Sequence, residues 1–262
     1  MKMMKMKRLA TIVLAGSLLA APLSALSAAP GSAIVFVNGI NNTFDDAVAS
    51  LQVLKTQLNA RDKNNTYIYG NAYNATQGAL SDIYQVFKQK SVEGSSPADF
   101  WRAIDGNSLP ASGMNAALQQ KYIDILTKND IPELPDHLNQ YRNYLKAQRK
   151  VVLVGHSQGT LYTNFEINLL VTGPDKAQGK ISAVNVGNAA RYQLPGSTYL
   201  TSHSDTVIGA LSLVQTVLPA NYSLGWHPLS DVLGHSFAKI YMNTSYSAAG
   251  QILQQVSQQA RN

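Results

Sequence analysis

Residues 151–160 constrain the fold of this chain more than any other stretch. They read Val-Val-Leu-Val-Gly-His-Ser-Gln-Gly-Thr, an apolar run that ends in a G-x-S-x-G pentapeptide. The β-branched run predicts a buried strand, and the apolar residues in 161–170 predict an amphipathic helix directly after it. Where a strand turns into a helix so abruptly, only glycine fits two positions before and after the serine. The sequence therefore predicts a tight turn that projects the hydroxyl of Ser157 out of the sheet.

Strands and helices alternate along the rest of the chain. Beside 151–154, strands are predicted at 33–37, 66–69, 181–187 and 198–203, and helices at 44–58, 79–90, 135–148, 207–217 and 246–260. Thr43 and Asp46 have the spacing of a helix capping box. This alternation predicts an α/β fold, a mostly parallel central sheet with helices on both faces. Functional groups in such sheets lie at the carboxyl ends of the strands.

The first 28 residues are expected to be a secretory signal peptide. They combine a basic start, an apolar stretch at 9–19 and small residues up to Ala28. The apolar stretch is shorter than the about 20 residues of a membrane span, so a secreted or periplasmic protein with no stable membrane anchor is expected. The segment holds 4 of the 21 Lys and Arg residues and none of the 15 acids, which leaves a net charge of +2 for 29–262. That balance does not indicate nucleic acid as a partner.

The composition also limits the chemistry. The chain has no cysteine, which excludes disulfides and metal–thiolate sites. No metal-binding or phosphate-binding motif is present, so neither a metal nor a cofactor is expected. The length of 29–262 suits one domain.

One segment, 91–132, interrupts the alternation and is interpreted as an insertion. It is rich in turn residues at its start and carries two apolar stripes at helical spacing. Their residues are Phe100, Trp101 and Ile104, then Leu118, Tyr122 and Ile125. Two interpretations stand: a cap over Ser157 that binds an acyl chain, or helices that bury these side chains against the main domain.

The strand–G-x-S-x-G–helix unit resembles the nucleophile elbow of the α/β-hydrolase family, and within it lipase- and carboxylesterase-like serine hydrolases. The resemblance follows the element order of the whole domain. It implies an enzyme that cleaves carboxylic esters through an acyl-enzyme on Ser157, acting on small-molecule or lipid esters, with contact to a lipid interface. The expected signal peptide makes it an exported enzyme. A thioesterase or acyltransferase with the same triad is an alternative, and a non-catalytic binding protein of this fold is a third. In this family the acid and then the histidine follow the nucleophile along the chain.

The order narrows the choice of a general base. The histidines of the chain are His137, His156, His203, His227 and His235. The first two precede the serine, and His203 lies too early to follow the acid. His235, in Gly-His-Ser-Phe, resembles the histidine loop of the family and is the expected base. His227 lies between tryptophan and proline, where a packing role is favoured, and it remains the alternative.

The expected acid is Asp205, which ends a predicted strand and begins a turn, where the family places this residue. Asp231 is the competitor because it lies four residues before His235, and its other interpretation is a loop cap. Asp175 lies in a Gly-Pro-Asp turn and is interpreted as a turn residue.

An acyl-transfer site also needs two backbone N–H donors for the oxyanion. The expected donors are Gln158, after the serine, and Ile40, in the turn after the first strand, where Gly39 lets the backbone approach. Many lipases have His-Gly at this turn, and Asn38 stands in place of that histidine. An ordinary Asn-Gly turn is the alternative interpretation of 38–39.

Overall fold

A single parallel sheet forms the centre of the molecule. The computed structural model describes residues 31–39, 42–74, 133–212, 216–224, 231 and 233–261. Its strands are arranged in the order β2-β1-β3-β4-β5. Their bounds are β1 (Ala33–Val37), β2 (Ile68–Ala72), β3 (Val151–His156), β4 (Ile181–Val186) and β5 (Thr198–Leu200). The predicted α/β class with a parallel sheet is confirmed.

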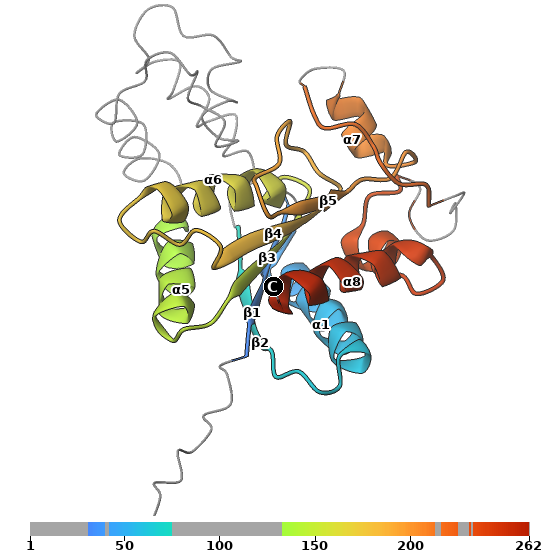
Figure 1. Ribbon diagram of the computed structural model, residues 1–262. Coiled ribbons are helices and arrows are strands. Elements are labelled where there is room, and N and C mark those ends of the chain that lie inside the picture. The colour runs from blue at the N-terminus through green and yellow to red at the C-terminus, as the bar shows by residue number, and fades with distance from the viewer. Residues whose placement is uncertain are drawn as a thin grey trace, which may run out of the picture.

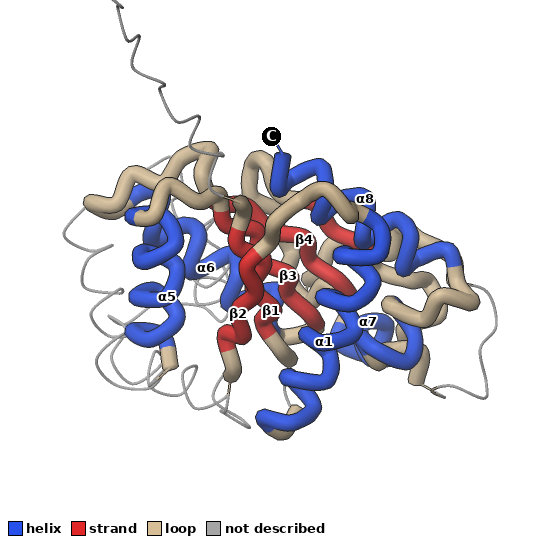
Figure 2. Tube along the Cα trace, turned by 90° about the horizontal axis from the view of Figure 1, so that it is seen from below, coloured by secondary structure: helices blue, strands red, loops and turns tan. Residues whose placement is uncertain are grey.

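Helices cover both faces of this sheet. The two faces are covered by α5 and α6 on one side and by α1 and α8 on the other (Figure 1), and the view from below separates the same two layers (Figure 2). The bounds are α1 (Phe44–Arg61), α5 (Leu134–Lys146), α6 (Gly159–Thr172), α7 (Thr206–Leu211), a π-helical turn η1 (Phe237–Tyr241) and α8 (Ser247–Arg261). The predicted capping box of α1 is present, with Thr43 and Asp46 each accepting from the other's backbone N–H.

The two covered faces explain the continuous apolar runs of the central strands. In β1, Ala33, Val35 and Val37 belong to the core under α5 and α6, whereas Ile34 and Phe36 belong to the core under α1 and α8. Successive side chains of a strand point to opposite faces. Because both faces are buried, every position of the strand must be apolar.

Several predicted element bounds are wrong. The strand predicted at 66–69 is β2, which begins at Ile68 and ends at Ala72 because it pairs with β1 over that register. The pairing includes Gly70 and Asn71, whose low strand propensity obscured the strand. The strand predicted at 198–203 ends at Leu200, and the helix predicted at 207–217 is the short α7.

The helix predicted at 161–170 is present as α6, but the prediction that it is amphipathic is wrong. From Gly159 to Ile167, every residue of α6 is buried, including Thr160, Asn164 and Glu166. A helix enclosed on all sides has no polar face. Its buried polar side chains are held by hydrogen bonds instead, such as that from Asn164 Nδ2 to the carbonyl of Tyr192.

Some predictions lie outside the described residues: the signal peptide at 1–28, the helix at 79–90, the insertion at 91–132, Ile40 and His227. Within the described ranges, no helix has the length and apolar character needed to cross a membrane.

Candidate active site

The site begins at the turn between β3 and α6, where Ser157 has a φ of +56°. This left-handed conformation is unfavourable for a residue with a side chain and persists only where packing enforces it. The flanking glycines show the crowding. A Cβ on Gly155 would lie 2.9 Å from Thr163 Cγ2, and a Cβ on Gly159 would lie 2.2 Å from the carbonyl oxygen of Val37. The predicted strand–turn–helix unit is therefore present, with glycine required at both positions.

Asp205 and His235 meet although they lie thirty residues apart in the chain. His235 Nδ1 lies 2.9 and 2.8 Å from Asp205 Oδ1 and Oδ2. The Asp205 side chain is fully buried, and it also accepts from the Tyr241 hydroxyl at 2.7 Å and from the N–H of Ile208 at 3.0 Å. Since a carboxylate only accepts, Nδ1 carries the proton, and the neutral ring has its lone pair at Nε2.

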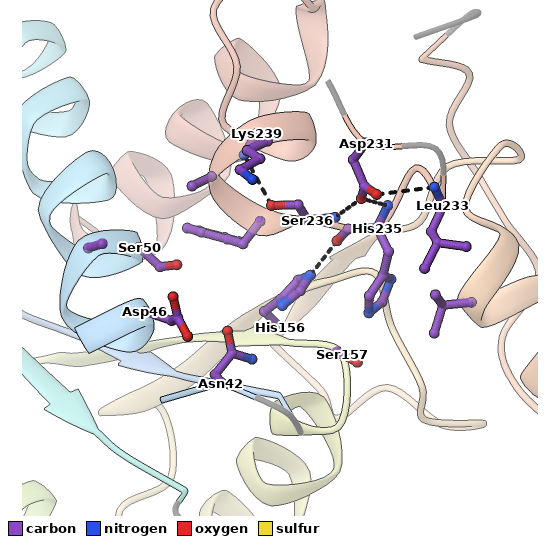
Figure 3. Close-up of a pocket in the computed structure, with 14 residues that line it drawn as sticks. Asn42, Asp46, Ser50, His156, Ser157, Asp231, Leu233, His235, Ser236 and Lys239 are labelled. Carbon is purple, nitrogen blue, oxygen red and sulfur yellow. Dashed lines mark hydrogen bonds between the residues drawn. The ribbon is translucent and has the colours of Figure 1, made fainter. Parts of the chain in front are cut away.

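Asp231, the competing acid, binds backbone rather than the imidazole. Its carboxylate accepts from the N–H groups of Leu233, His235 and Ser236 at 3.1, 2.9 and 2.8 Å (Figure 3). Partial burial raises the pKa of Asp231, but these three donors outweigh it and lower the pKa below its ordinary value. Asp231 thus shapes the turn that presents His235.

His156, the residue before the serine, also contacts the turn that carries His235. Its Nε2 donates to the backbone carbonyl of His235 at 2.8 Å, and the two imidazole rings are 4.8 Å apart between centroids. Burial, and secondarily the neighbouring His235, lower the pKa of His156 to about 3. His156 was not the expected base because it precedes Ser157 in the chain. Apart from its position in the pentapeptide, nothing in the sequence indicated a role for it. It contributes a neutral ring that lies tilted against the ring of His235.

The turn after β1 lies directly against the serine. A Cβ on Gly39 would lie 2.6 Å from Ser157 Cβ and 3.1 Å from Ser157 Oγ, so only glycine allows this approach. On the other side of the serine, Gln158 is buried and precedes the first residue of α6. The first N–H groups of a helix have no acceptor within the helix. Gly39 and Gln158 thus flank Ser157 in space and in the chain, while the predicted donor Ile40 lies outside the described residues.

Ser157 and His235 line one pocket of about 580 Å³, between α1 and the turn that carries His235 (Figure 3). Polar walls come from Asn42, Asp46, Ser50, Asp231, Ser236 and Lys239, and apolar walls from Ala49, Val207, Leu233, Phe237 and Ala238. Leu233 is exposed, at 55%. The pocket offers both polar and apolar surface next to the serine hydroxyl.

The remaining candidates lie elsewhere. His203 contacts the carbonyl of Tyr222 at the surface, and Asp175 forms an ion pair with Arg142 at 3.0 Å. Among the described residues, no cluster of three or more His, Asp or Glu side chains could hold a metal ion.

The structure thus joins Asp205 to His235, places His235 and Ser157 in one pocket, and lays Gly39 against Ser157. No protein-family model matches the chain, and no curated protein matches it in sequence. Any functional assignment therefore rests on this arrangement and on the sequence motif.

Proposed function

We propose that the protein is a serine hydrolase of the α/β-hydrolase fold that cleaves carboxylic esters through an acyl-enzyme on Ser157. The observation that carries the proposal is the Asp205–His235 pair, because it orients a base in the pocket that the strained serine lines. A buried carboxylate, an imidazole and a serine in this chain order are the parts that acyl transfer needs.

In the first half of the reaction, Ser157 Oγ attacks the ester carbonyl carbon while His235 Nε2 takes the hydroxyl proton. The carbonyl oxygen becomes an oxyanion, which backbone N–H groups at Gln158 and in the turn after β1 stabilise. Collapse of the tetrahedral intermediate breaks the bond to the alcohol oxygen, and the imidazolium returns its proton to that oxygen. The alcohol leaves and the acyl group stays on Ser157.

In the second half, a water molecule replaces the alcohol. His235 takes one proton from the water, the hydroxide oxygen attacks the acyl carbon, and the bond to Ser157 Oγ breaks as the proton is returned to it. The carboxylic acid leaves. His235 is positively charged in both transition states, so the Asp205 carboxylate at 2.8 Å stabilises it. The ring of His156 is neutral over the working pH range and adds no opposing charge.

The test is replacement of the nucleophile. We expect Ser157→Ala to abolish hydrolysis of a chromogenic ester and to prevent covalent labelling by a fluorophosphonate, since both reactions need the Oγ atom. Ser182→Ala is the matched control, because Ser182 is a buried serine on β4 that lies outside the lining of the pocket. The control should keep both activities.

Peptide mass spectrometry of the labelled protein should place the adduct on Ser157. Retained hydrolysis in a folded Ser157→Ala protein, or an adduct on another serine, would overturn the proposal. Circular dichroism of each variant shows whether the fold is intact.

A further inference from the structure

Asn38, the residue that stands where many lipases have histidine, is fully buried beside the turn that touches Ser157. Its amide makes three hydrogen bonds. Nδ2 donates to the carbonyls of Gly39 at 2.9 Å and Asn74 at 3.0 Å, and Oδ1 accepts from the N–H of Asn74 at 2.8 Å. All three of these bonds are to backbone groups, and they use both donors and one acceptor site of the amide.

The two bonds to Asn74 extend the pairing of the sheet. Backbone pairing between β1 and β2 ends at Val37 and Ala72. Asn38 is the first residue after β1. Its carboxamide hydrogen-bonds to both the C=O and the N–H of Asn74, as the backbone of a neighbouring strand would. The turn after β1 is therefore fixed to the residues that follow β2.

The bond to Gly39 sets the orientation of a peptide. The Gly39 carbonyl accepts from Asn38 Nδ2 and also from Asn42 Nδ2, the latter at 3.1 Å. A trans peptide is planar, so its N–H points opposite to its carbonyl. The two donors on the Gly39 carbonyl therefore restrict rotation of the Gly39 peptide group, which lies against Ser157 in the turn to which the proposed mechanism assigns an oxyanion donor.

The residues to which Asn38 is anchored are themselves held. The Tyr73 hydroxyl donates to the Asn42 carbonyl at 3.2 Å, and the Tyr73 carbonyl accepts from His137 Nε2 at 3.0 Å. His137 in turn binds Glu166 on α6 at 2.7 Å. Residues 73–74 thus form a fixed support between the helix layer and the turn.

We infer that Asn38 is a positioning residue for oxyanion stabilisation: its amide, held by Asn74, orients the Gly39 peptide against Ser157. The inference rests on the proposed function. It assigns Asn38 no contact with substrate. Loss of its bonds should therefore weaken binding of the transition state while ground-state binding stays nearly unchanged.

The experiment replaces Asn38 by Ala, which removes the three bonds without burying a charge, and by Asp, which keeps the shape but loses the donors. Both variants should lower kcat by about 10- to 100-fold, somewhat less than the loss of a whole oxyanion donor. KM should change little. The inhibition constant of a trifluoromethyl ketone, whose adduct with serine carries an oxyanion, should rise in parallel with the loss of kcat/KM.

Asn164→Asp is the matched control. Asn164 is also fully buried and donates from Nδ2 to a backbone carbonyl, that of Tyr192, at 2.8 Å, but it lies on α6 away from the turn. It should lose stability and keep kcat per folded molecule. A folded Asn38→Ala protein with wild-type kcat and inhibition constant would overturn the inference. Equal losses of kcat in Asn38→Ala and Asn164→Asp would overturn it too, because a general loss of stability would then explain both.

Failure of the proposed function gives a different result. If Ser157 is not the nucleophile, the wild-type protein and all three variants fail to label Ser157 with the fluorophosphonate. If only the inference about Asn38 is wrong, Ser157 is labelled and the Asn38 variants hydrolyse esters at the wild-type rate.

Discussion

Two aspartates lie within reach of the turn that carries His235, and their partners separate their roles. Asp205 caps α7 by accepting from Ile208 and binds the imidazole with the same carboxylate. The carboxylate oxygens of Asp231 instead accept hydrogen bonds from three backbone N–H groups. A carboxylate on the ring sets its tautomer and stabilises the imidazolium, whereas a carboxylate on the backbone sets only the shape of the loop.

Substitution by asparagine should separate the two. In Asp205→Asn, the new amide can donate to His235 Nδ1, which places the ring proton on Nε2 and removes the base. We expect kcat to fall by about 10⁴-fold, the loss known for this change in a serine triad. In Asp231→Asn, we expect kcat to change by less than about 10-fold, and the free energy of unfolding to fall by about 1–3 kcal/mol through weakened backbone hydrogen bonds.

The stability effect should also depend on pH with a defined sign. The pKa of Asp231 is lowered in the folded protein, so its stabilisation is present above the unfolded pKa and is lost as the pH falls through the folded pKa. Urea titrations of wild type and Asp231→Asn should therefore converge below about pH 4. The opposite pattern of activity, with Asp231→Asn inactive and Asp205→Asn active, would reverse the assignment of the acid.

At the scale of elements, α5 and α6 share a buried charged cluster. Glu166 on α6 is fully buried and binds two side chains of α5, His137 Nδ1 at 2.7 Å and the Tyr141 hydroxyl at 2.9 Å. Because His137 Nε2 donates to the Tyr73 carbonyl, the protonated ring is the form that satisfies both of its neighbours. Burial alone would lower the pKa of His137, but the Glu166 carboxylate raises it above the ordinary value.

This cluster predicts a pH-dependent effect of Glu166→Gln. A raised pKa means that the stabilisation is complete below the unfolded pKa, about 6.5, and is lost as the pH rises through the folded pKa. The variant should lose about 3 kcal/mol of unfolding free energy near pH 6, and the gap from wild type should narrow toward pH 9. Chemical denaturation at each pH measures it.

Asp175→Asn is the control for this prediction, because it breaks an exposed ion pair with Arg142 on α5. It should cost less than about 1 kcal/mol and show no step near neutral pH. A Glu166→Gln gap that is constant or widens from pH 6 to pH 9 would contradict a protonated His137.

The elements also show what the sequence could and could not predict. The parallel α/β class, the capped start of α1 and the turn at Ser157 follow from patterns within short stretches of sequence, so they could be predicted. The predicted bounds of β2 were wrong because pairing with β1 outweighs the low strand propensity of Gly70 and Asn71. The roles of Asn38, His156 and Glu166 were not predicted, since their bonds join residues far apart in the chain and no spacing encodes them.

At the scale of the whole molecule, the two cores lie on opposite faces of one sheet. The core under α1 and α8 includes the apolar face of the C-terminal helix, and Ile252 is fully buried in it. The same helix is tied to the sheet by Gln259 Nε2, which donates to the Ala183 carbonyl at 3.1 Å. Because both cores use side chains of the same strands, neither can unfold without exposing the other, so the domain should unfold in one cooperative step.

Truncation of Ile252 tests whether the two cores unfold together. Ile252→Ala should lower the free energy of unfolding by about 2–5 kcal/mol, the usual cost of a cavity at a fully buried isoleucine. The slope of the urea transition should be unchanged, since the same surface is exposed when both cores unfold together. Ester hydrolysis per folded molecule should stay close to wild type, because Ile252 does not line the pocket.

The control is Gln254→Ala, at an exposed position of the same helix, which should change the free energy of unfolding by less than about 0.5 kcal/mol. A biphasic transition in Ile252→Ala, with ester hydrolysis surviving the first phase, would show that the two faces of the sheet unfold independently.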